Sequence, residues 1–452
     1  MQAARTGPYA IAAANPMILP ITEIVSKAGI QFGKLIGTLE SLMSFDWSRV
    51  VMPKRLPVFI ICFLVGTETF GQAASQPLLL GESFTIDSGL LDESRRVLIA
   101  VPQSYQRSDE RYGVVYVLDA ETQFEHIVSS TQFLAGFANQ SIPPVIVVGI
   151  ANTDRMRDLT PASGASESSA FRQGGADQFL RFVVDELFPW VDQNYRTSDF
   201  RVLVGHSLGG LFAVHALSSA PDVFDALLVI DPSLNWNAQE PARHATEFLA
   251  AGRQLNTALY LALSSPAAPE SAGSRRVIDA LSSSAADDFR WSVAQFTGES
   301  HDSIPLPAAF QGLRWIFADW NVDDLAEGVF SAAPAQDILD EIDQIYMQSG
   351  RTFGLERETP YLVFESLLSY LAETDRVDEA ASLTLRHTDR YPLPLVPNVI
   401  AGIAELLAEG RGQRAAVDYL NAVIEIYPGN ETAQDALIEL GVDPSGNVIS
   451  ER

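Results

Sequence analysis

The sequence predicts an α/β fold in which a mostly parallel sheet carries helices on both faces and is followed by a smaller all-α region. From about residue 82, short apolar runs of β type alternate with helical stretches. One of these runs leads through a sharp glycine-rich turn into a helix of small residues. After Trp320 the strand signal ends and long helical stretches follow. At 452 residues the chain is long enough for one large domain and one smaller domain.

We expect the α/β region over residues 76–325, and its apolar runs and helical stretches predict the positions of its strands and helices. The pattern predicts an opening antiparallel pair of strands at 83–87 and 95–101. The remaining strands are predicted to be buried and are joined by helices. We expect these strands at 113–119, 145–150, 202–204, 258–263 and 290–296, with helices at 123–137 and 178–195.

The glycine-rich turn is Gly205-His-Ser-Leu-Gly209, a Gly-x-Ser-x-Gly motif that follows the apolar run 202–204. A serine hydroxyl is a weak nucleophile at neutral pH, so it must stand clear of the sheet, beside a base and beside N–H groups that receive the oxyanion. A strand, a sharp turn and a helix provide this setting, and the glycines leave room for the turn. The motif therefore predicts a nucleophile elbow with Ser207 as the nucleophile, and an α/β-hydrolase fold around it.

The order Ser, acid, His along an α/β-hydrolase chain selects the partners of Ser207. Of the six histidines, only His301 stands in a loop directly after a late strand, so it is the predicted base. His206 lies inside the elbow and should point away from the hydroxyl. An acid is expected after the strand at 258–263, where Glu270 is the first carboxylate. Glu270 either completes a triad or is only a solvated loop charge.

Two backbone N–H groups are candidates for the oxyanion hole. In this fold one belongs to the residue after the nucleophile, here Leu208. The other comes from the loop that follows the strand at 113–119, which makes Ala120 the candidate. The alternative for Ala120 is an ordinary strand end.

The polar loop 151–161 follows a buried strand, at the end of the sheet where open α/β proteins bind ligands. Asn152, Arg155 and Arg157 are its candidate substrate-binding residues. The two arginines could hold a carboxylate or phenolate of a substrate, or they could be tied to Asp158 and neighbouring carbonyls. The sequence contains no metal-ligand spacing and no phosphate-binding glycine loop, so we expect neither a metal nor a cofactor.

Four motifs stand in order along the chain: Tyr116-Val-Leu-Asp119, Asn152-Thr-x-Arg-x-Arg-Asp-Leu-Thr-Pro161, Gly205-His-Ser-Leu-Gly-Gly210 and Glu299-Ser-His301-x-Ser-x-Pro-Leu-Pro307. This order resembles the esterase D family of serine esterases over about residues 80–320, and within it the branch that includes siderophore-ester hydrolases. The resemblance implies an α/β-hydrolase fold and ester hydrolysis at a Ser-His centre. It also implies that a Ser-His dyad can suffice, as in some relatives.

The sequence departs from this family in the segment Ile230-Asp-Pro-Ser-Leu-Asn-Trp236. Relatives tend to read Ser-Pro-Ser-Leu-Trp-Trp there, so Asp231 and Asn235 are departures. Asp302 also stands where glycine is usual. These differences concern the identity of the substrate more than the chemistry. Trp236 is a further candidate for contact with the substrate.

The segment Met52-Pro-Lys-Arg-Leu-Pro-Val-Phe-Ile-Ile-Cys-Phe-Leu-Val-Gly66 is typical of a secretory signal peptide. It has a basic start, an apolar run at 56–65 and a small-x-small cleavage site, Gly71-Gln-Ala73. A run of this length is too short to cross a bilayer, which takes about 20 residues. We expect Met52 to be the true start, residues 1–51 to be an upstream over-extension, and the mature protein to be periplasmic or extracellular. The alternative is a short membrane anchor or a core segment.

Cleavage after Ala73 would remove Cys62, the single cysteine, and every lysine. Taking away the six basic and four acidic residues of 1–73 leaves 24 basic residues against 53 acidic ones, a formal charge of −29. Such a surface repels nucleic acid and anionic membranes, so we expect neither nucleic-acid binding nor stable membrane insertion. An anionic substrate would require a local arginine cluster.

The predicted helical region covers residues 330–445. Leu371-Ala-Glu, Ala380 and Tyr391-Pro392 realign with Leu407-Ala-Glu, Ala416 and Tyr427-Pro428 at an offset of 36 residues. This offset is close to the 34 residues of tetratricopeptide repeats, which predicts degenerate helical hairpins of that type. Because about three repeats are needed for stability, the region is expected to pack on the hydrolase, on a second copy or on a protein partner.

These observations predict an exported serine esterase that acts on a small-molecule ester. Ser207 would attack the ester carbonyl, His301 would take and return the proton, and the Leu208 N–H would help hold the oxyanion. Two alternatives stay open. An acyltransferase would use the same residues with an alcohol in place of water, and a non-catalytic binding protein would leave Ser207 unlabelled by a fluorophosphonate.

Overall fold

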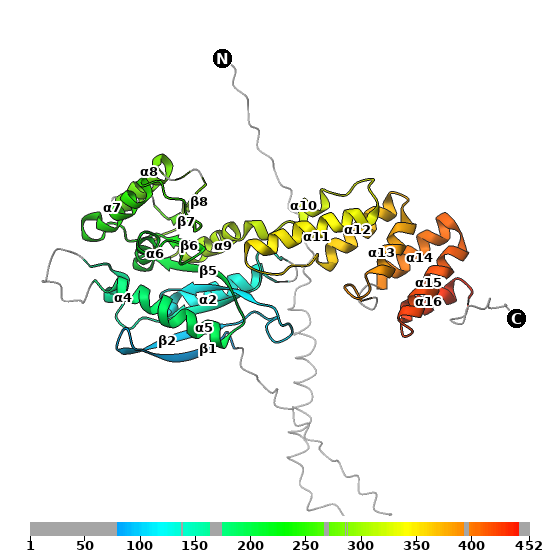
Figure 1. Cartoon of the computed structure of the whole chain (residues 1–452), viewed down its shortest axis with the longest axis horizontal. Coiled ribbons are helices and arrows are strands. Elements are labelled where there is room, and N and C mark those ends of the chain that lie inside the picture. The colour runs from blue at the N-terminus through cyan, green and yellow to red at the C-terminus, as the bar shows by residue number, and fades with distance from the viewer. Residues whose placement is uncertain are drawn as a thin grey trace, which may run out of the picture. The chain divides into compact units, whose positions relative to one another are not determined.

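The computed structural model describes residues 79–136, 139–162, 174–265, 271–284, 286, 288–392 and 397–442. The predicted signal peptide, Cys62 and Glu270 lie outside these residues. An eight-stranded sheet is the centre of the first part of the described chain, and helices alone make up its last part (Figure 1).

The sheet has the order β1-β2-β4-β3-β5-β6-β7-β8. The pairs β1–β2 and β2–β4 are antiparallel, and each of the other neighbouring pairs is parallel. The strands are β1 (Glu82–Ser88), β2 (Glu93–Ala100), β3 (Tyr112–Val117), β4 (Val145–Ile150), β5 (Thr197–His206), β6 (Ala226–Ile230), β7 (Ala258–Leu263) and β8 (Trp291–Gln295). The parallel strands therefore all end at the same edge, where β5 delivers the elbow.

Both faces of the sheet are buried, which explains why its central strands are continuous apolar runs. Along β3, Val114 and Tyr116 face one core, whereas Val115 and Val117 face the other, as the two-residue period of a strand requires. All four side chains are fully buried. The sheet is thus a rigid layer held between two apolar cores.

Different helices cover the two faces. One core packs the sheet against α4 (Ala176–Arg181), a π-helical segment (Phe182–Leu187), α5 (Phe188–Asn194), α6 (Leu208–Ser219), α7 (Trp236–Ala250) and α8 (Ala272–Ser284). The other packs it against α2 (Ala120–Leu134) and α9 (Pro305–Ile316). The short helix α3 (Arg155–Leu159) belongs to the loop after β4.

The predicted fold class is confirmed: a mixed α/β sheet with flanking helices is followed by a helical region. Every predicted strand overlaps an observed one, and the opening pair is antiparallel as expected. The helix predicted at 123–137 begins three residues earlier, at Ala120, because Asp119 adopts a left-handed conformation with φ 54° and turns the chain sharply at the end of β3. The helix predicted at 178–195 is interrupted by the π-helical turn.

The helical region consists of α10 (Asp323–Glu327), α11 (Ala335–Thr352), α12 (Tyr361–Glu373), α13 (Val377–Arg386), α14 (Pro397–Arg411), α15 (Gln413–Ile426) and α16 (Glu431–Glu439). These helices share an apolar core of their own, to which each contributes a buried face. The helices α12 and α14 begin 36 residues apart, at Tyr361 and Pro397, and α13 and α15 begin at the same spacing. This is the offset seen in the sequence, while the tetratricopeptide assignment stays a prediction.

One aromatic side chain from the helical region is part of the core of the sheet domain. Phe353, which follows α11, is 1% exposed and lies with its ring 5.0 Å from that of Phe200 and 5.4 Å from that of Phe317. Its carbonyl accepts a hydrogen bond from the Ser198 hydroxyl at 3.3 Å. The sheet domain therefore uses a residue that lies well beyond Trp320.

We predict that Phe353→Ala destabilises the sheet domain by about 3 kcal/mol, since truncation of a buried phenylalanine leaves a cavity as well as removing apolar contacts. Chemical denaturation monitored by fluorescence measures this. Leu325→Ala is the control, because Leu325 is 60% exposed and its truncation should change the free energy of unfolding by less than about 0.5 kcal/mol. Equal effects of the two changes would contradict the shared core.

Candidate active site

The elbow places Ser207 between the end of β5 and the start of α6 in a strained backbone conformation, φ 58° and ψ −116°. A β-carbon on Gly205 would lie 2.2 Å from the carbonyl oxygen of Gly209, so only glycine fits at that position. The Ser207 N–H donates to the Ile230 carbonyl at 3.0 Å, which ties the turn to β6. The sequence therefore folds into the turn that the motif predicts.

The His301 side chain reaches the nucleophile from the loop between β8 and α9. Its Nε2 lies 3.0 Å from the Ser207 hydroxyl oxygen, which is hydrogen-bond distance for a proton transfer. The Ser207 hydroxyl also lies 3.1 Å from that of Ser233. The imidazole is half exposed, so a substrate and water have access to it. The structure thus brings together the predicted nucleophile and the predicted base.

A carboxylate contacts His301, and it belongs to Asp231; Glu270, the acid proposed from the sequence, lies outside the described residues. Asp231 Oδ2 lies 3.2 Å from His301 Nδ1, and the side chain of Asp231 is 9% exposed. Asp231 follows β6 directly and accepts hydrogen bonds from both the N–H and the hydroxyl of Ser264 at the end of β7. Asp231 thus stands one strand before the strand that was used to predict the acid, and in the sequence it was noted only as a departure from the family pattern.

The two candidate oxyanion N–H groups lie at helix starts on neighbouring strands. Leu208 is the first residue of α6 and Ala120 is the first residue of α2, positions whose N–H has no acceptor within its own helix. The turn of α6 closely approaches the end of β3, because a β-carbon on Gly209 would lie 3.3 Å from Asp119 Oδ2 and 3.4 Å from the Leu118 side chain. The predicted pair therefore stands at one edge of the sheet, beside Ser207.

Comparison with known proteins identifies a family for the chain. Residues 88–302 match the family model described as "Putative esterase". The crystal structure of an IroE-like serine hydrolase from Shewanella oneidensis is 31% identical, has a TM-score of 0.56, and is matched over 96% of its length by 66% of this chain. The chain belongs to this esterase family. It is a carboxylic ester hydrolase.

Two of the curated relatives are named as esterases. The ferri-bacillibactin esterase BesA of Bacillus subtilis is 26% identical over 226 residues, which are 45% of this chain and 78% of the relative. The siderophore enterobactin esterase of Emericella nidulans is 29% identical over 198 residues, 38% of this chain and 64% of the relative. The family model ends at residue 302, so that match concerns the sheet domain.

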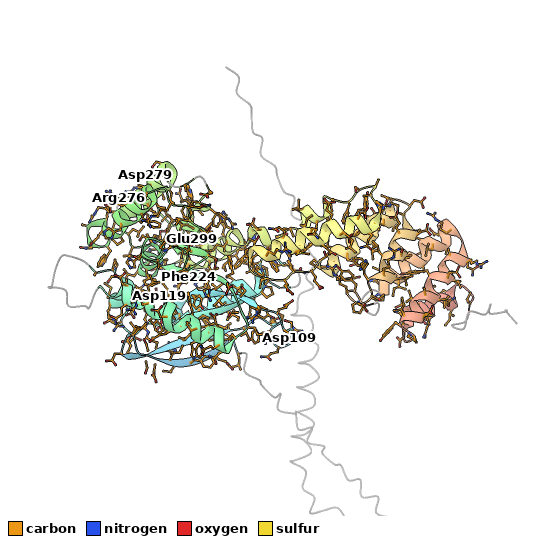
Figure 2. The ribbon with its side chains drawn as sticks, in the orientation of Figure 1. Asp109, Asp119, Phe224, Arg276, Asp279 and Glu299 are labelled. Carbon is orange, nitrogen blue, oxygen red and sulfur yellow. The ribbon has the colours of Figure 1, made fainter. Side chains whose placement is uncertain are left out.

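Asn152 and Arg155 both bind Asp119, the residue that precedes Ala120. The Asn152 amide donates to Asp119 Oδ1 at 2.7 Å, and the Arg155 guanidinium donates to both carboxylate oxygens at 2.6 and 2.8 Å. The hydrogen bonds and charge of Asp119 raise the pKa of Arg155 despite its partial burial. Figure 2 labels Asp119, and it also labels Glu299, which belongs to the loop that carries His301. Arg155 and Asn152 thus hold the turn that carries the Ala120 N–H.

Arg157 and Trp236, the other two candidate substrate-binding residues, have structural contacts. The Arg157 guanidinium donates to Glu93 at 2.6 and 3.0 Å and to Asp158 at 2.6 Å. The same two carboxylates bind the fully buried Arg95. Trp236 begins α7 and packs, partly buried, against the apolar core. Arg157 is therefore tied to Asp158 and Glu93, as the alternative to substrate binding by the arginines of this loop had it.

Two further histidines lie near the catalytic one. His206 Nε2 is 2.8 Å from the main-chain oxygen of His301, and the two rings lie 4.6 Å apart. Burial, together with the charge of His301, lowers the pKa of His206. Burial lowers the pKa of His126 on α2 to about 4, and the charge of His206 acts in the same direction. As expected from the sequence, His206 does not serve the hydroxyl of Ser207.

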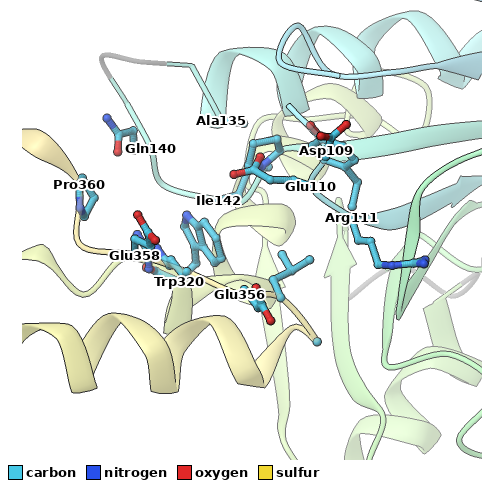
Figure 3. Close-up of a pocket in the computed structure, with 15 residues that line it drawn as sticks. Asp109, Glu110, Arg111, Ala135, Gln140, Ile142, Trp320, Glu356, Glu358 and Pro360 are labelled. Carbon is cyan, nitrogen blue, oxygen red and sulfur yellow. The ribbon is translucent and has the colours of Figure 1, made fainter. Parts of the chain in front are cut away.

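A cavity of about 820 Å³ lies away from this chemistry (Figure 3). It is bordered by Tyr112 at the first residue of β3, by Trp320 and by the segment after Phe353, with Arg111, Glu356 and Glu358 among its polar residues. Ser207 and His301 stand at the other end of the parallel strands and do not line it. We therefore do not assign this cavity to ester hydrolysis.

Two other kinds of feature, a metal site and a membrane-spanning helix, are absent from the part of the chain that the structure describes. No group of three or more His, Cys, Asp or Glu side chains there is arranged to hold a metal ion. Among the described helices, none has the length and apolar character needed to span a bilayer.

The sequence analysis missed Asp231 and the contact between His206 and the His301 loop. The signal for Asp231 was present, since it follows the buried run 226–230 directly and so stands at the edge of the sheet that carries Ser207. A carboxylate in that position is within reach of a base presented at the same edge. The contact of His206 depends on the path of a distant loop, which no local pattern encodes.

We predict that Arg157→Ala lowers the free energy of unfolding by about 2 kcal/mol, because hydrogen bonds to charged groups each contribute about 1.5–3 kcal/mol. KM for a small ester should stay unchanged, since the guanidinium is committed to Glu93 and Asp158. Denaturation curves and steady-state kinetics check both statements, with the 65%-exposed Arg181→Ala as control. An increase in KM without loss of stability would show that Arg157 binds substrate.

Proposed function

We propose that the chain is an exported serine esterase that hydrolyses carboxylic esters through an acyl-enzyme on Ser207. The observation that carries the proposal is the row of hydrogen-bonded groups Ser207 Oγ, His301 Nε2, His301 Nδ1 and Asp231 Oδ2, with separations of 3.0 and 3.2 Å between residues. This is the relation of nucleophile, base and orienting acid that activates a serine.

In the first half of the reaction, His301 Nε2 takes the proton of Ser207 while the serine oxygen bonds to the ester carbonyl carbon. The carbonyl oxygen becomes an oxyanion, which the N–H groups of Leu208 and Ala120 are positioned to receive. Asp231 holds the imidazole with its proton on Nδ1 and stabilises the imidazolium that forms. Collapse of the intermediate breaks the ester C–O bond, and the proton passes from His301 to the departing alcohol.

In the second half, water loses a proton to His301 Nε2 and attacks the acyl carbon. The intermediate collapses with return of that proton to Ser207, which releases the carboxylic acid. The names of the curated relatives extend the proposal to esters of siderophore type as the substrate class. Support for that class comes from likeness to those proteins alone, while the hydrolytic centre is argued from residues of this chain.

We predict that Ser207→Ala and His301→Ala each lower kcat by about 10⁴-fold or more, and that the double variant is little worse than either, because the residues act as a unit. Asp231→Asn should lose about 10²–10⁴-fold, since an amide can favour the wrong tautomer of His301. Initial rates on p-nitrophenyl acetate and on an enterobactin-type trilactone measure these effects.

The control for the acid is Glu270→Gln, which should retain full activity. A loss in Glu270→Gln as large as that in Asp231→Asn would restore Glu270 as the acid and remove Asp231. Retention of more than a tenth of the activity in His301→Ala would contradict the assignment of the base, because a tenfold change corresponds to only about 1.4 kcal/mol.

The export part of the proposal rests on the sequence between Met52 and Ala73. We predict that expression of the full reading frame in a Gram-negative host places the protein in the periplasm with Ala74 as its first residue, because the Gly71-Gln-Ala73 site would be cleaved. Fractionation and N-terminal sequencing measure this, and Ala73→Arg is the variant that should block cleavage. Intact protein in the cytosolic fraction would contradict export.

A further inference from the structure

We propose that His206 is a positioning residue for ester hydrolysis: its Nε2–H holds the main-chain oxygen of His301 and so sets the distance between the catalytic imidazole and Ser207. The inference rests on the Ser207–His301 chemistry proposed above. It starts from the 2.8 Å separation between His206 Nε2 and His301 O and from the packing of the two rings, whose centres lie 4.6 Å apart.

The hydrogen bond fixes the tautomer of His206. A main-chain carbonyl oxygen carries no hydrogen and can only accept, so His206 Nε2 must be the donor. A neutral imidazole has one N–H, and in His206 it is therefore on Nε2. Four titratable groups face this ring: His301 and His126, and the carboxylates of Asp119 and Asp231. Burial and the neighbouring His301 outweigh the two carboxylates and lower its pKa, which favours the neutral ring.

His206 is anchored in the central sheet. It is the last residue of β5, and its backbone is in register with Ile230 of the neighbouring strand β6. It also immediately precedes Ser207. One end of the hydrogen bond is thus fixed by the same strand that fixes the nucleophile, and any shift of the bond changes the separation of the two catalytic residues.

The loop that carries His301 is tied to the sheet domain at its ends, by the Phe296 N–H on the Leu263 carbonyl and by the buried Ile304, and the bond from His206 ties it at His301 between them. Its side-chain hydrogen bonds from Ser303 to Glu299 and from the Ser300 N–H to Ser303 lie within the loop, so they set its shape but not its place against the sheet. Asp231 orients the imidazole through Nδ1. The bond from His206 acts on the backbone of His301 itself. Asp231 therefore orients the ring of His301, whereas His206 positions its main chain.

The expected effect is on kcat. Proton transfer requires the hydroxyl and the imidazole within about 2.6–3.2 Å, and a displacement of about 1 Å can cost about 10²-fold. We expect His206→Phe, which keeps a ring but has no donor, to lower kcat by about 10–100-fold with KM within about threefold of the parent. We expect His206→Gln, whose amide N–H can donate, to recover kcat to within about fivefold of the parent enzyme.

Stopped-time assays on p-nitrophenyl acetate with the full chain give kcat and KM for these variants. His215→Gln is the matched control, because His215 lies on α6 and pairs with Asp177 away from the catalytic residues. Thermal melting reports whether each variant is folded. Unchanged kcat in His206→Phe would overturn the proposal, and so would a kcat in folded His206→Gln as low as that of His206→Phe.

A second measurement keeps the proposal testable if a variant fails to fold. Proton–nitrogen correlation NMR of the ¹⁵N-histidine-labelled parent enzyme distinguishes the two tautomers of each ring, and the His206→Gln or His206→Phe spectrum identifies the His206 signals. We expect the Nε2–H form of His206 at pH 7–8, and the Nδ1–H form would overturn the proposal. Activity surviving in Ser207→Ala would instead defeat the proposed function, so the two failures can be told apart.

Discussion

The close approach of two backbone segments at the elbow is the constraint on which the rest of the site depends. The backbones of Gly205 and Gly209 lie so close together that a side chain on Gly205 would not fit between them. This close approach lets β5 turn directly into α6 and leaves Ser207 in a backbone conformation that most residues avoid. Such a conformation costs about 1–3 kcal/mol and persists only where its surroundings enforce it. Here the enforcement comes from a sheet buried on both faces and from the bond between the Ser207 N–H and Ile230.

Every other group of the proposed centre stands at the ends of the same parallel strands. Asp119 ends the β3 segment, Ser207 follows β5, Asp231 follows β6 and Ser264 follows β7. The loop after β8 then returns His301 to this edge. Because parallel strands present their carboxyl ends together, short side chains from four segments can meet there without long loops. The polar neighbours of the site are largely paired with one another, as Arg155 and Asn152 are with Asp119.

The elements that could be predicted from sequence were those with a local signal. Short apolar runs located every strand of the sheet except β6, and the Gly-x-Ser-x-Gly turn located the nucleophile because its backbone geometry demands glycine. His301 followed from chain order. Asp231 did not follow from that rule, because the acid was sought after the strand at 258–263, whereas the carboxylate that contacts His301 stands one strand earlier and is held by Ser264. The roles of His206 and Phe353 depend on contacts between segments about 95 and 155 residues apart, which no local pattern contains.

The proposed mechanism requires that Ser207 form the covalent intermediate while the N–H groups of Leu208 and Ala120 hold the oxyanion. A crystal structure of the enzyme inactivated by a p-nitrophenyl alkylphosphonate tests it most directly, because the tetrahedral phosphorus imitates the intermediate. We expect a phosphorus–oxygen bond to Ser207, with the phosphoryl oxygen about 2.7–3.1 Å from both nitrogens. A phosphonate on another residue, or a phosphoryl oxygen turned away from both N–H groups, would contradict it.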